Sequence, residues 1–425
     1  MSTEKNSHPP QTLAQKLIAK AAGRSHVAVG EIVNCQVDLA MFHDSSGPRR
    51  LKPMLEELGA EIWDKSRVVL VMDHYVPERD DDSRRIVRIA REWAVEQQLP
   101  HVYDSMGICH VVLPQKGHLK PGMFCVGGDS HSPTGGALGT YMFGVGSTEM
   151  LGVVVTGQLW VRVPQTLLMR WNNRLKPGVT AKDMMLHMIG QFGMNGGQYQ
   201  AVEFAGEAVK ALSMQERMTM SNMSAEMGAQ VGLIAADSIT RDYLKSVGVS
   251  QADIEQCDYF ETDETADFQR FDFEASQLSP QVAAPHSPEN TKAVSEFAHI
   301  KPSVAYIGAC TGAKLVDLRA AAEVLKGRKV APGVQLMVAP ASARDQAQAQ
   351  REGVMQILTD AGARVLPNAC GACAGYGGTF EEGATVISST ARNFQGRMGP
   401  ASVQVYLASP ATVAASALQG HIADV

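Results

Sequence analysis

An α/β fold with mostly parallel sheets is the fold class that the sequence predicts. Short apolar segments alternate with amphipathic segments along much of the chain, which is typical of β–loop–α units and of parallel sheets covered by helices. Polar motifs follow directly after several of the apolar segments, where open α/β sheets bind ligands. The chain has 425 residues. This length predicts two or three packed subdomains.

The first half contains two expected strands that end in polar residues. A buried strand of sequence RVVLVM is expected to end at Asp73 and His74, and another runs into Asp129, Ser130 and His131. Helical periodicity lies between them, because apolar side chains recur on one side of a charged segment. The expected elements are a helix at residues 12–22, a strand at 67–72, a helix at 82–98 and a strand at 123–126.

The alternation is clearest in the last third of the chain, where short apolar runs are separated by amphipathic ones. A glycine at position 327 is expected to close one of these helices. The expected strands are residues 304–307, 334–338, 364–366 and 385–387, and the expected helices are residues 315–325 and 343–352.

The middle of the chain is different in character. Residues 167–247 are rich in methionine, which we interpret as gap-filling core rather than a metal–thioether site. Residues 257–289 are acidic and poor in periodicity, so we interpret them as a connection. We therefore expect an N-terminal tail and helix at 1–24, a first subdomain at 25–163, a second subdomain with the acidic connection at 164–289, and a third subdomain at 290–425.

Composition excludes some classes of partner. The net charge is −6, and the pI near 6.1 leaves no global basic field to attract nucleic acid or an anionic membrane. The most apolar segment, residues 151–163, is too short to span a bilayer. The polar first ten residues show no apolar core of a secretory signal. We expect a cytoplasmic protein without nucleic-acid or membrane partners.

Three of the seven cysteines stand in a pattern that indicates metal binding. An odd, scattered count argues against a disulfide framework. Cys370 and Cys373 form a Cys-x-x-Cys turn, and Cys310 follows an expected strand between glycines. A redox dithiol, a zinc site and a [4Fe–4S] cluster are the three interpretations. Spacing favours the cluster over zinc and over unrelated thiols but does not settle the choice.

Whole motifs resemble those of the aconitase family. Tyr306-Ile-Gly-Ala-Cys310-Thr is similar to the family's Ile-Gly-Ser-Cys-Thr-Asn, and Cys370-Gly-Ala-Cys373 to its Cys-Gly-Pro-Cys. The remaining matches, in family order, are Asp73-His74, Gly107-Ile-Cys-His110, Gly128-Asp-Ser-His-Ser-Pro-Thr, Asn222-Met-Ser-Ala-Glu226 and Arg392-Asn-Phe-Gln-Gly-Arg397. The resemblance extends over residues 26–425. Within the family, the sequence looks most similar to large subunits of isopropylmalate dehydratase and of prokaryotic homoaconitase.

The resemblance implies a fold and a cofactor. The fold is aconitase-like, with three α/β subdomains and mostly parallel sheets around a central iron–sulfur cluster. The cofactor is a [4Fe–4S] cluster held by Cys310, Cys370 and Cys373, whose remaining iron has no protein ligand. Such an iron can act as a Lewis acid on a hydroxyl group.

The resemblance also implies the reacting side chains. A carboxylate on one ring nitrogen fixes the tautomer of a histidine and raises its basicity. Arginine suits a dicarboxylate, since its planar fork binds bidentately. The implied catalytic residues are Asp73 with His74, Asp129 with His110, Glu226 with His131, and Ser130. The implied substrate-binding residues are Asn222, Arg392 and Arg397.

The implied activity is a hydro-lyase or isomerase of amino-acid biosynthesis that dehydrates and rehydrates a 2-hydroxy dicarboxylate of the isopropylmalate type. In the family, the base that removes the carbon-bound proton is a serine on a swivelling fourth domain. The chain ends at Val425, after the third subdomain. We therefore expect a separate small swivel-domain subunit to complete the active site of a heterodimer.

The sequence differs from the family's motifs at three positions, and these differences bear on which substrate is bound. Gly312 stands in place of an asparagine, Lys314 in place of a common arginine, and Ala391 in place of an asparagine before Arg392. A homoaconitase or a dehydratase of another alkyl-substituted malate is therefore an alternative. A non-catalytic cluster-binding sensor or scaffold is a second one.

Overall fold

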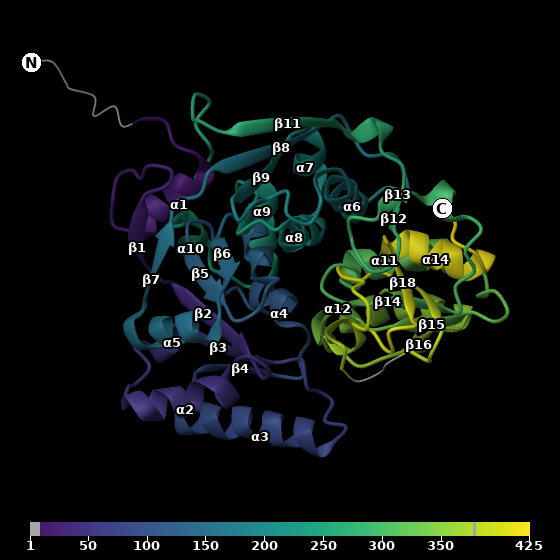
Figure 1. Ribbon diagram of the computed structural model, residues 1–425, viewed down its shortest axis with the longest axis horizontal. Helices are drawn as coiled ribbons and strands as arrows, with labels where there is room; N and C mark the ends of the chain where they lie inside the picture. The colour runs from purple at the N-terminus through teal and green to yellow at the C-terminus, as the bar shows by residue number, and fades with distance from the viewer. Residues whose placement is uncertain (1–8, 377–379) are drawn as a thin grey trace, which may run out of the picture.

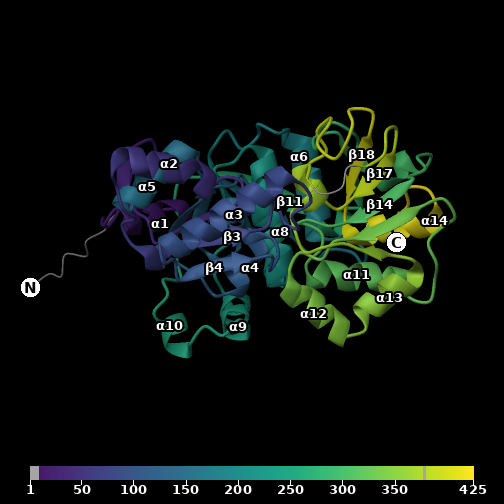
Figure 2. The same cartoon turned by 90° about the horizontal axis from the view of Figure 1, so that it is seen from below.

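The computed structural model describes residues 9–376 and 380–425 (Figure 1). The first eight residues of the expected tail, and Gly377 and Gly378 beyond the Cys-x-x-Cys turn, lie outside this range. Three groups of strands, each with its own helices, follow one another along the chain. Figure 2 shows helices of the middle group between the purple N-terminal elements and the yellow C-terminal elements. We call the three groups the first, second and third lobe.

The first lobe is built on a parallel sheet of five strands, in the order β4-β3-β2-β5-β6. A separate antiparallel ribbon pairs β1 with β7. The strands are β1 Ile32–Gln36, β2 Leu39–His43, β3 Val68–Met72, β4 His101–Asp104, β5 Phe124–Gly127, β6 Tyr141–Gly144 and β7 Gln158–Arg162. The helices are α1 Leu13–Ala21, α2 Pro48–Leu58, α3 Asp81–Glu96, α4 Cys109–Gln115 and α5 Ser147–Thr156, with 3₁₀ turns η1 Lys65–Arg67 and η2 Ser132–Leu138.

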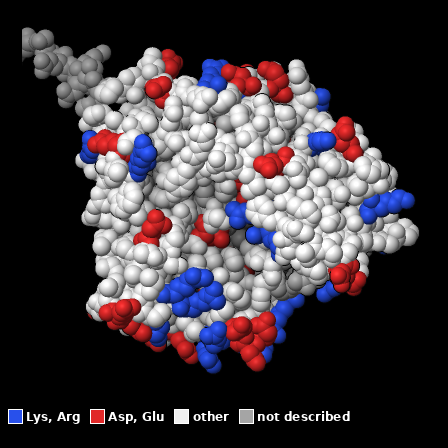
Figure 3. All heavy atoms as spheres, in the orientation of Figure 1, with Lys and Arg blue, Asp and Glu red and all other residues white. Residues whose placement is uncertain are grey.

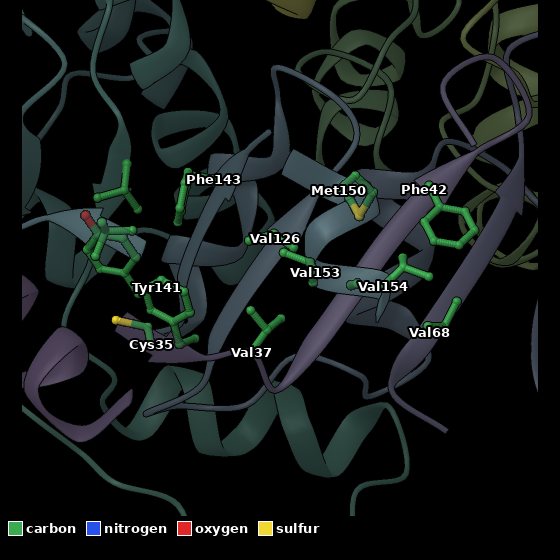
Figure 4. Close-up of a cluster of buried hydrophobic side chains, with 14 of the residues drawn as sticks. Cys35, Val37, Phe42, Val68, Val126, Tyr141, Phe143, Met150, Val153 and Val154 are labelled. Atoms are coloured by element: carbon green, nitrogen blue, oxygen red, sulfur yellow. The ribbon is translucent and has the colours of Figure 1, made fainter. Parts of the chain in front are cut away.

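Both faces of this sheet are buried, which explains the unbroken apolar run of β3. Val68 and Leu70 face a core shared with α3 and α5, and part of this core is shown in Figure 4. Val69 and Val71 face the opposite core, which includes Met218 of a second-lobe helix. Alternate residues of a strand point to opposite faces, so a strand covered on both sides needs apolar residues throughout.

The second lobe has a parallel sheet of four strands, in the order β10-β9-β8-β11. Its strands are β8 Thr166–Asn172, β9 Ala201–Ala205, β10 Val231–Leu233 and β11 Gln269–Glu274. Its helices are α6 Ala181–Phe192, α7 Glu207–Ala211, α8 Met214–Met223, α9 Ser238–Ser246 and α10 Gln251–Glu255, with 3₁₀ turns η3 Ser224–Met227 and η4 Ala275–Gln277. Met184, Met185 and Met188 of α6 are fully buried in the apolar core, as the sequence predicts.

The third lobe has seven strands in the order β13-β12-β18-β17-β14-β15-β16, parallel from β18 to β16 and antiparallel at β12 and β13. Its strands are β12 Gln281–Ala283, β13 Thr291–Ala293, β14 Val304–Ile307, β15 Gln335–Val338, β16 Arg364–Val365, β17 Thr385–Ser388 and β18 Gln404–Ala408. Its helices are α11 Leu315–Leu325, α12 Ala343–Arg351, α13 Val354–Ala361 and α14 Pro410–Gln419, with 3₁₀ turns η5 Val294–Phe297 and η6 Gly371–Ala374.

The predicted α/β class with mostly parallel sheets is confirmed, and the structure adds strands in the segment interpreted as a connection. β11 lies at the edge of the second sheet, and β12 joins the third sheet although it precedes residue 290. β11 is mostly exposed and β12 has only three residues. The apolar alternation in β11 is limited to Phe271 and Phe273, and β12 is too short to show a period in the sequence. The subdomain bounds remain a proposal, with β12 belonging to the last sheet.

A buried carboxyl in the second lobe predicts a pH-dependent stability. Glu203 of β9 is buried, and burial raises its pKa to about 7, although Thr262 Oγ1 donates a hydrogen bond to it at 2.6 Å. A folded-state pKa above the unfolded one means that stability falls as pH rises between the two values. The loss for this group is about 3 kcal/mol, complete above pH 7.

We therefore expect Glu203→Gln to flatten the fall in unfolding free energy between pH 5 and pH 8, measured by urea denaturation. Asp183 is also buried, and burial raises its pKa to about 6, so it contributes a smaller fall of the same sign that the variant keeps. An unchanged slope in the variant would refute the assignment.

Candidate active site

The carboxyl ends of strands from two sheets meet at one place. Asp73 and His74 follow β3, and Asp129 follows β5 in the first lobe, whereas Cys310 follows β14 and Arg392 follows β17 in the third lobe. The backbone N–H of Cys370 donates to the carbonyl of Asp73 at 2.9 Å, which joins the two lobes directly. Figure 3 shows charged side chains around a hollow between the two sides of the molecule.

Asp73 and His74 form the first histidine–carboxylate pair. His74 Nδ1 lies 2.7 Å from Asp73 Oδ1, and the other Asp73 oxygen accepts the backbone N–H of Cys109. Burial opposes protonation of His74, but the charges of Asp73, Asp129 and Asp44 outweigh it and raise its pKa to about 10. His74 therefore keeps a proton on Nε2 at neutral pH.

Asp129 and His110 form the second histidine–carboxylate pair. His110 Nε2 lies 2.7 Å from Asp129 Oδ1, and the backbone N–H of His131 donates to the same oxygen. His74 Nε2 lies 3.8 Å from the second oxygen, Oδ2. Burial favours protonation of Asp129, but the positive charge and hydrogen bond of His110, with His43 and His131, hold its pKa well below the usual value. Asp129 is thus a carboxylate surrounded by imidazoles.

Glu226 forms the third pair and joins all three lobes. It lies in η3 of the second lobe, and its Oε1 is 2.9 Å from His131 Nε2 of the first lobe. Arg392 Nε of the third lobe donates to the same oxygen at 2.6 Å. Arg392 Nη1 also donates to Ser130 Oγ at 2.9 Å. All these residues, which the sequence predicts, lie together.

His43 and Asp44 belong to the site and were missed in the sequence. The ring of His43 stacks on His74, with centroids 3.9 Å apart, and its Nε2 is 3.6 Å from Asp129 Oδ2. Asp44 accepts the backbone N–H groups of His74 and Tyr75 at 3.1 and 2.7 Å, which shapes the loop. The signal that could have revealed them is their place directly after the apolar run of β2.

The three thiols lie close to these histidine–carboxylate pairs, since the backbone of Cys370 is hydrogen-bonded to Asp73 and His131 acts on the pKa of Cys373. Cys310 and Cys373 are buried and Cys370 is partly buried, and none is in a disulfide. The Cys370 thiol donates a hydrogen bond to Cys373, and this bond, with the charges of Arg397 and His131, holds the pKa of Cys373 well below the usual value. Burial raises the pKa of Cys310 to about 12.

The three thiols suit an iron–sulfur cluster better than a single zinc ion. Sulfur ligands of one tetrahedral zinc ion lie roughly 3.8 Å apart. In the described part of the chain, the groups whose ligand atoms all lie within 4.8 Å of one another contain no cysteine. No described group places three thiols at the spacing of one zinc ion, and an iron–sulfur cluster prefers an all-thiolate donor set such as this one. The donor set therefore fits an iron–sulfur cluster.

Asn222 and Arg397 lie beside the thiols. Asn222 is fully buried, and its Nδ2 donates to Cys310 Sγ at 3.2 Å and to Thr134 Oγ1 at 2.7 Å. Its Oδ1 is buried without a hydrogen-bond partner among the described residues, as is Nε of Arg397. Asn222 therefore contacts a thiol directly, and its Oδ1 is the atom left for a ligand.

The three positions that differ from the aconitase-family motifs, Gly312, Lys314 and Ala391, are all in tightly packed surroundings. A Cβ at Gly312 would lie 2.3 Å from the side chain of Ser389. The Ser389 hydroxyl accepts the N–H of Gly308 and lies 3.1 Å from the carbonyl of Gly312, so it occupies the space that a side chain would need. Lys314 is buried and donates to the carbonyl of Cys310 at 2.8 Å. Ala391 is also buried.

A hollow of about 420 Å³ opens beside Ser130 and Arg392. Between its polar residues the lining is small and apolar, and it includes Pro133, Val145 and Ala229. A ligand with an anionic end at the arginine and an apolar substituent against these residues fits this lining.

Residues 15–420 match the sequence profile of the aconitase family (aconitate hydratase). The chain belongs to the aconitase family. This membership makes it a hydro-lyase and implies an iron–sulfur cluster. No helix in the described ranges is long and apolar enough to cross a membrane.

Relatives in the aconitase family match almost end to end. The "3-isopropylmalate dehydratase large subunit 1" of Methanopyrus kandleri is 42% identical over 419 residues, which cover 97% of this chain and 98% of that one. The "3-isopropylmalate dehydratase large subunit" of Moorella thermoacetica is 42% identical over 417 residues, with the same coverage. The holo-form of Thermococcus kodakaraensis aconitase X has a similar fold, with a TM-score of 0.50 at 14% identity over 87% of this chain and 88% of that one.

The raised pKa of His74 can be tested directly. Asp73→Asn removes the largest attractive charge, so burial should dominate and the pKa of His74 should fall from about 10 to below neutrality. The measurement is an NMR titration of labelled histidines in the metal-free chain. Asp82→Asn, on the exposed face of α3, is the control and should change nothing. A His74 pKa that stays near 10 in the Asp73 variant would contradict the pairing.

Proposed function

We propose that this chain is the large, catalytic subunit of a [4Fe–4S]-dependent hydro-lyase that dehydrates and rehydrates a 2-hydroxy dicarboxylate of the isopropylmalate type. The observation that carries the proposal is that three histidine–carboxylate pairs and a partly buried arginine are brought together at the point where the three lobes meet, with the three thiols close to them. Relatives that match almost end to end and are named 3-isopropylmalate dehydratase large subunits support the substrate.

Cys310, Cys370 and Cys373 would hold the cluster, and Asn222 would donate to the sulfur of Cys310. When bound, a cluster with one iron free of protein ligands supplies a Lewis acid for the leaving hydroxyl. Ligation requires the thiolate form of all three side chains, so uptake of the metal would release their protons. Small residues around the thiols, such as Gly308 and Gly312, allow backbone amides to approach the sulfurs.

The imidazoles would hold and move the protons of the reaction. His74 is kept protonated by Asp73 and presents its Nε2 proton beside Asp129, which suits a general acid for the leaving hydroxyl. His110 is held by Asp129, and His131 by Glu226, so each ring keeps one orientation. Asp129 stays ionised among these rings and compensates their charge.

Arg392 would bind a substrate carboxylate. Glu226 and Ser130 occupy its Nε and Nη1, and its Nη2 makes no hydrogen bond to any residue in the described ranges. This leaves one edge of the guanidinium for an anion. Arg397, whose Nε has no hydrogen-bond partner among the described residues and whose charge acts on Cys373, is a second candidate beside the thiols. The apolar lining near Arg392 favours an alkyl-substituted malate over an unsubstituted one.

We also propose a small swivel-domain subunit as partner, which would supply the base that removes the carbon-bound proton. The support is that this chain matches nearly the full length of relatives whose names call them large subunits. A cytoplasmic location is proposed as well, because the seven cysteines form no disulfide and a reducing compartment keeps thiols free.

Turnover should depend on the partner. We expect the cluster-loaded chain alone to show little dehydration of 2- and 3-alkylmalates, and a small subunit of the isopropylmalate dehydratase type to raise the rate on the order of 10² to 10⁴. The measurement is the absorbance of the unsaturated product under anaerobic conditions. Full turnover by the chain alone would show that the base lies within it.

Iron binding should depend on the three thiols. Anaerobic reconstitution should load about four irons, with the broad visible absorption of thiolate-ligated iron. Cys310→Ser should lower both, whereas Cys257→Ser, at a partly exposed cysteine outside the site, should leave them unchanged. Uptake of one zinc ion in place of iron under these conditions would contradict the proposal.

A further inference from the structure

Lys182 has a buried ammonium group to which the proposed function assigns no role. It is the second residue of α6, and its side chain is almost completely buried. Its Nζ donates to the carbonyls of Ser389 and Thr390 at 2.5 and 2.7 Å, and lies 3.4 Å from Thr311 Oγ1. All its acceptors therefore lie in two loops of the third lobe, although α6 belongs to the second.

These two loops carry the residues of the candidate site. Thr311 follows Cys310 after β14, and Thr390 lies two residues before Arg392 after β17. β14 and β17 are neighbours in the third sheet. The Thr311 hydroxyl also donates to the Ser389 carbonyl at 3.1 Å, so the loops contact each other at the ammonium. One side chain from another lobe therefore holds the thiol loop and the guanidinium loop together.

The charge of Lys182 has no direct partner. No carboxylate oxygen of the described residues lies within 4.0 Å of its Nζ. By contrast, Nζ of Lys314, the other buried lysine in the described ranges, lies 2.8 Å from Asp317 Oδ2. Burial accordingly lowers the pKa of Lys182 to about 8, although the charges of Asp317, Cys373 and Glu226 oppose this. A buried charge without a partner is costly, and a neutral donor could satisfy the same carbonyls at lower cost.

We propose that Lys182 is a positioning residue that fixes the Cys310 loop against the Arg392 loop and places a positive charge beside the thiolates. Its three acceptors set the distance between the first thiol ligand and the carboxylate-binding arginine. Its charge offsets the negative charge that three thiolates and Glu226 bring into a buried site. The charge role rests on the proposed function, because it requires a thiolate-bound cluster, whereas the positioning role requires only the chain.

The positioning role is tested in the metal-free chain, by the rate at which iodoacetamide alkylates each cysteine, followed by mass spectrometry. Lys182→Met should raise the rate at Cys310 about tenfold, because the bonds of a charged donor that hold the loop are lost. Cys125, buried in the first sheet, should react as slowly as before and shows that the variant is folded. Lys176→Met, an exposed lysine just before α6, is the matched control and should change neither rate.

The charge role is tested by a second variant. Lys182→Gln keeps a donor without the charge, so it should protect Cys310 more than methionine does but still lose iron faster than the wild type after reconstitution. With the small subunit present, Lys182→Met should raise KM for the dicarboxylate about tenfold and change kcat less, since Arg392 is displaced.

The outcomes separate the two proposals. Wild-type alkylation of Cys310 in folded Lys182→Met would overturn the positioning role. Wild-type iron retention in Lys182→Gln would overturn the charge role. Faster alkylation at every cysteine, with an unchanged KM, would show a structural lysine only. A wild-type chain that takes up no iron would refute the proposed function, while the alkylation result would still decide the position of Lys182.

Discussion

A single carboxylate oxygen, Oε1 of Glu226, joins the three lobes at the candidate site. It accepts His131 from the first lobe and Arg392 from the third, and it is itself fixed in a 3₁₀ turn of the second. Burial favours the neutral acid, but the interactions with His131 and Arg392 hold the pKa of Glu226 below its usual value. The lobes are thus held by a buried charge network in which removing one member would leave the others unpaired.

Other carboxylates of the candidate site are held by partners on both of their oxygens. Asp129 has imidazoles on both oxygens, and Asp73 has a histidine on one side and a backbone N–H on the other. Carboxylates and nitrogen donors therefore alternate through a largely buried site. Each ring keeps its orientation before a substrate arrives, and such preorganisation reduces the reorganisation that proton transfer would otherwise require.

Most of the fold could be predicted from the sequence, because buried parallel strands such as β3 are apolar on both faces and end in polar residues. The site residues could be predicted because they stand in motifs that resemble those of the aconitase family. β11 was not predicted, since this mostly exposed edge strand has only Phe271 and Phe273 as an apolar alternation within an acidic segment. His43 and Asp44 were missed because the apolar run before them was not interpreted as a strand. The contact of Asn222 with Cys310 depends on how α8 packs, which no local pattern records.

The crowding at Gly312 has an evolutionary consequence. Any side chain at this position would collide with Ser389, whose segment leads to Arg392 and is held by Lys182. Exchange of Gly312 for the asparagine of other family members therefore requires a compensating shift of that segment. Substitutions in the loop after β14 and in the loop after β17 are therefore coupled, and a substitution at position 312 that is neutral in a relative would be deleterious here. Through this epistasis, the residue at position 312 limits how the loop that carries Arg392 can change, and so limits the substrates that it can bind.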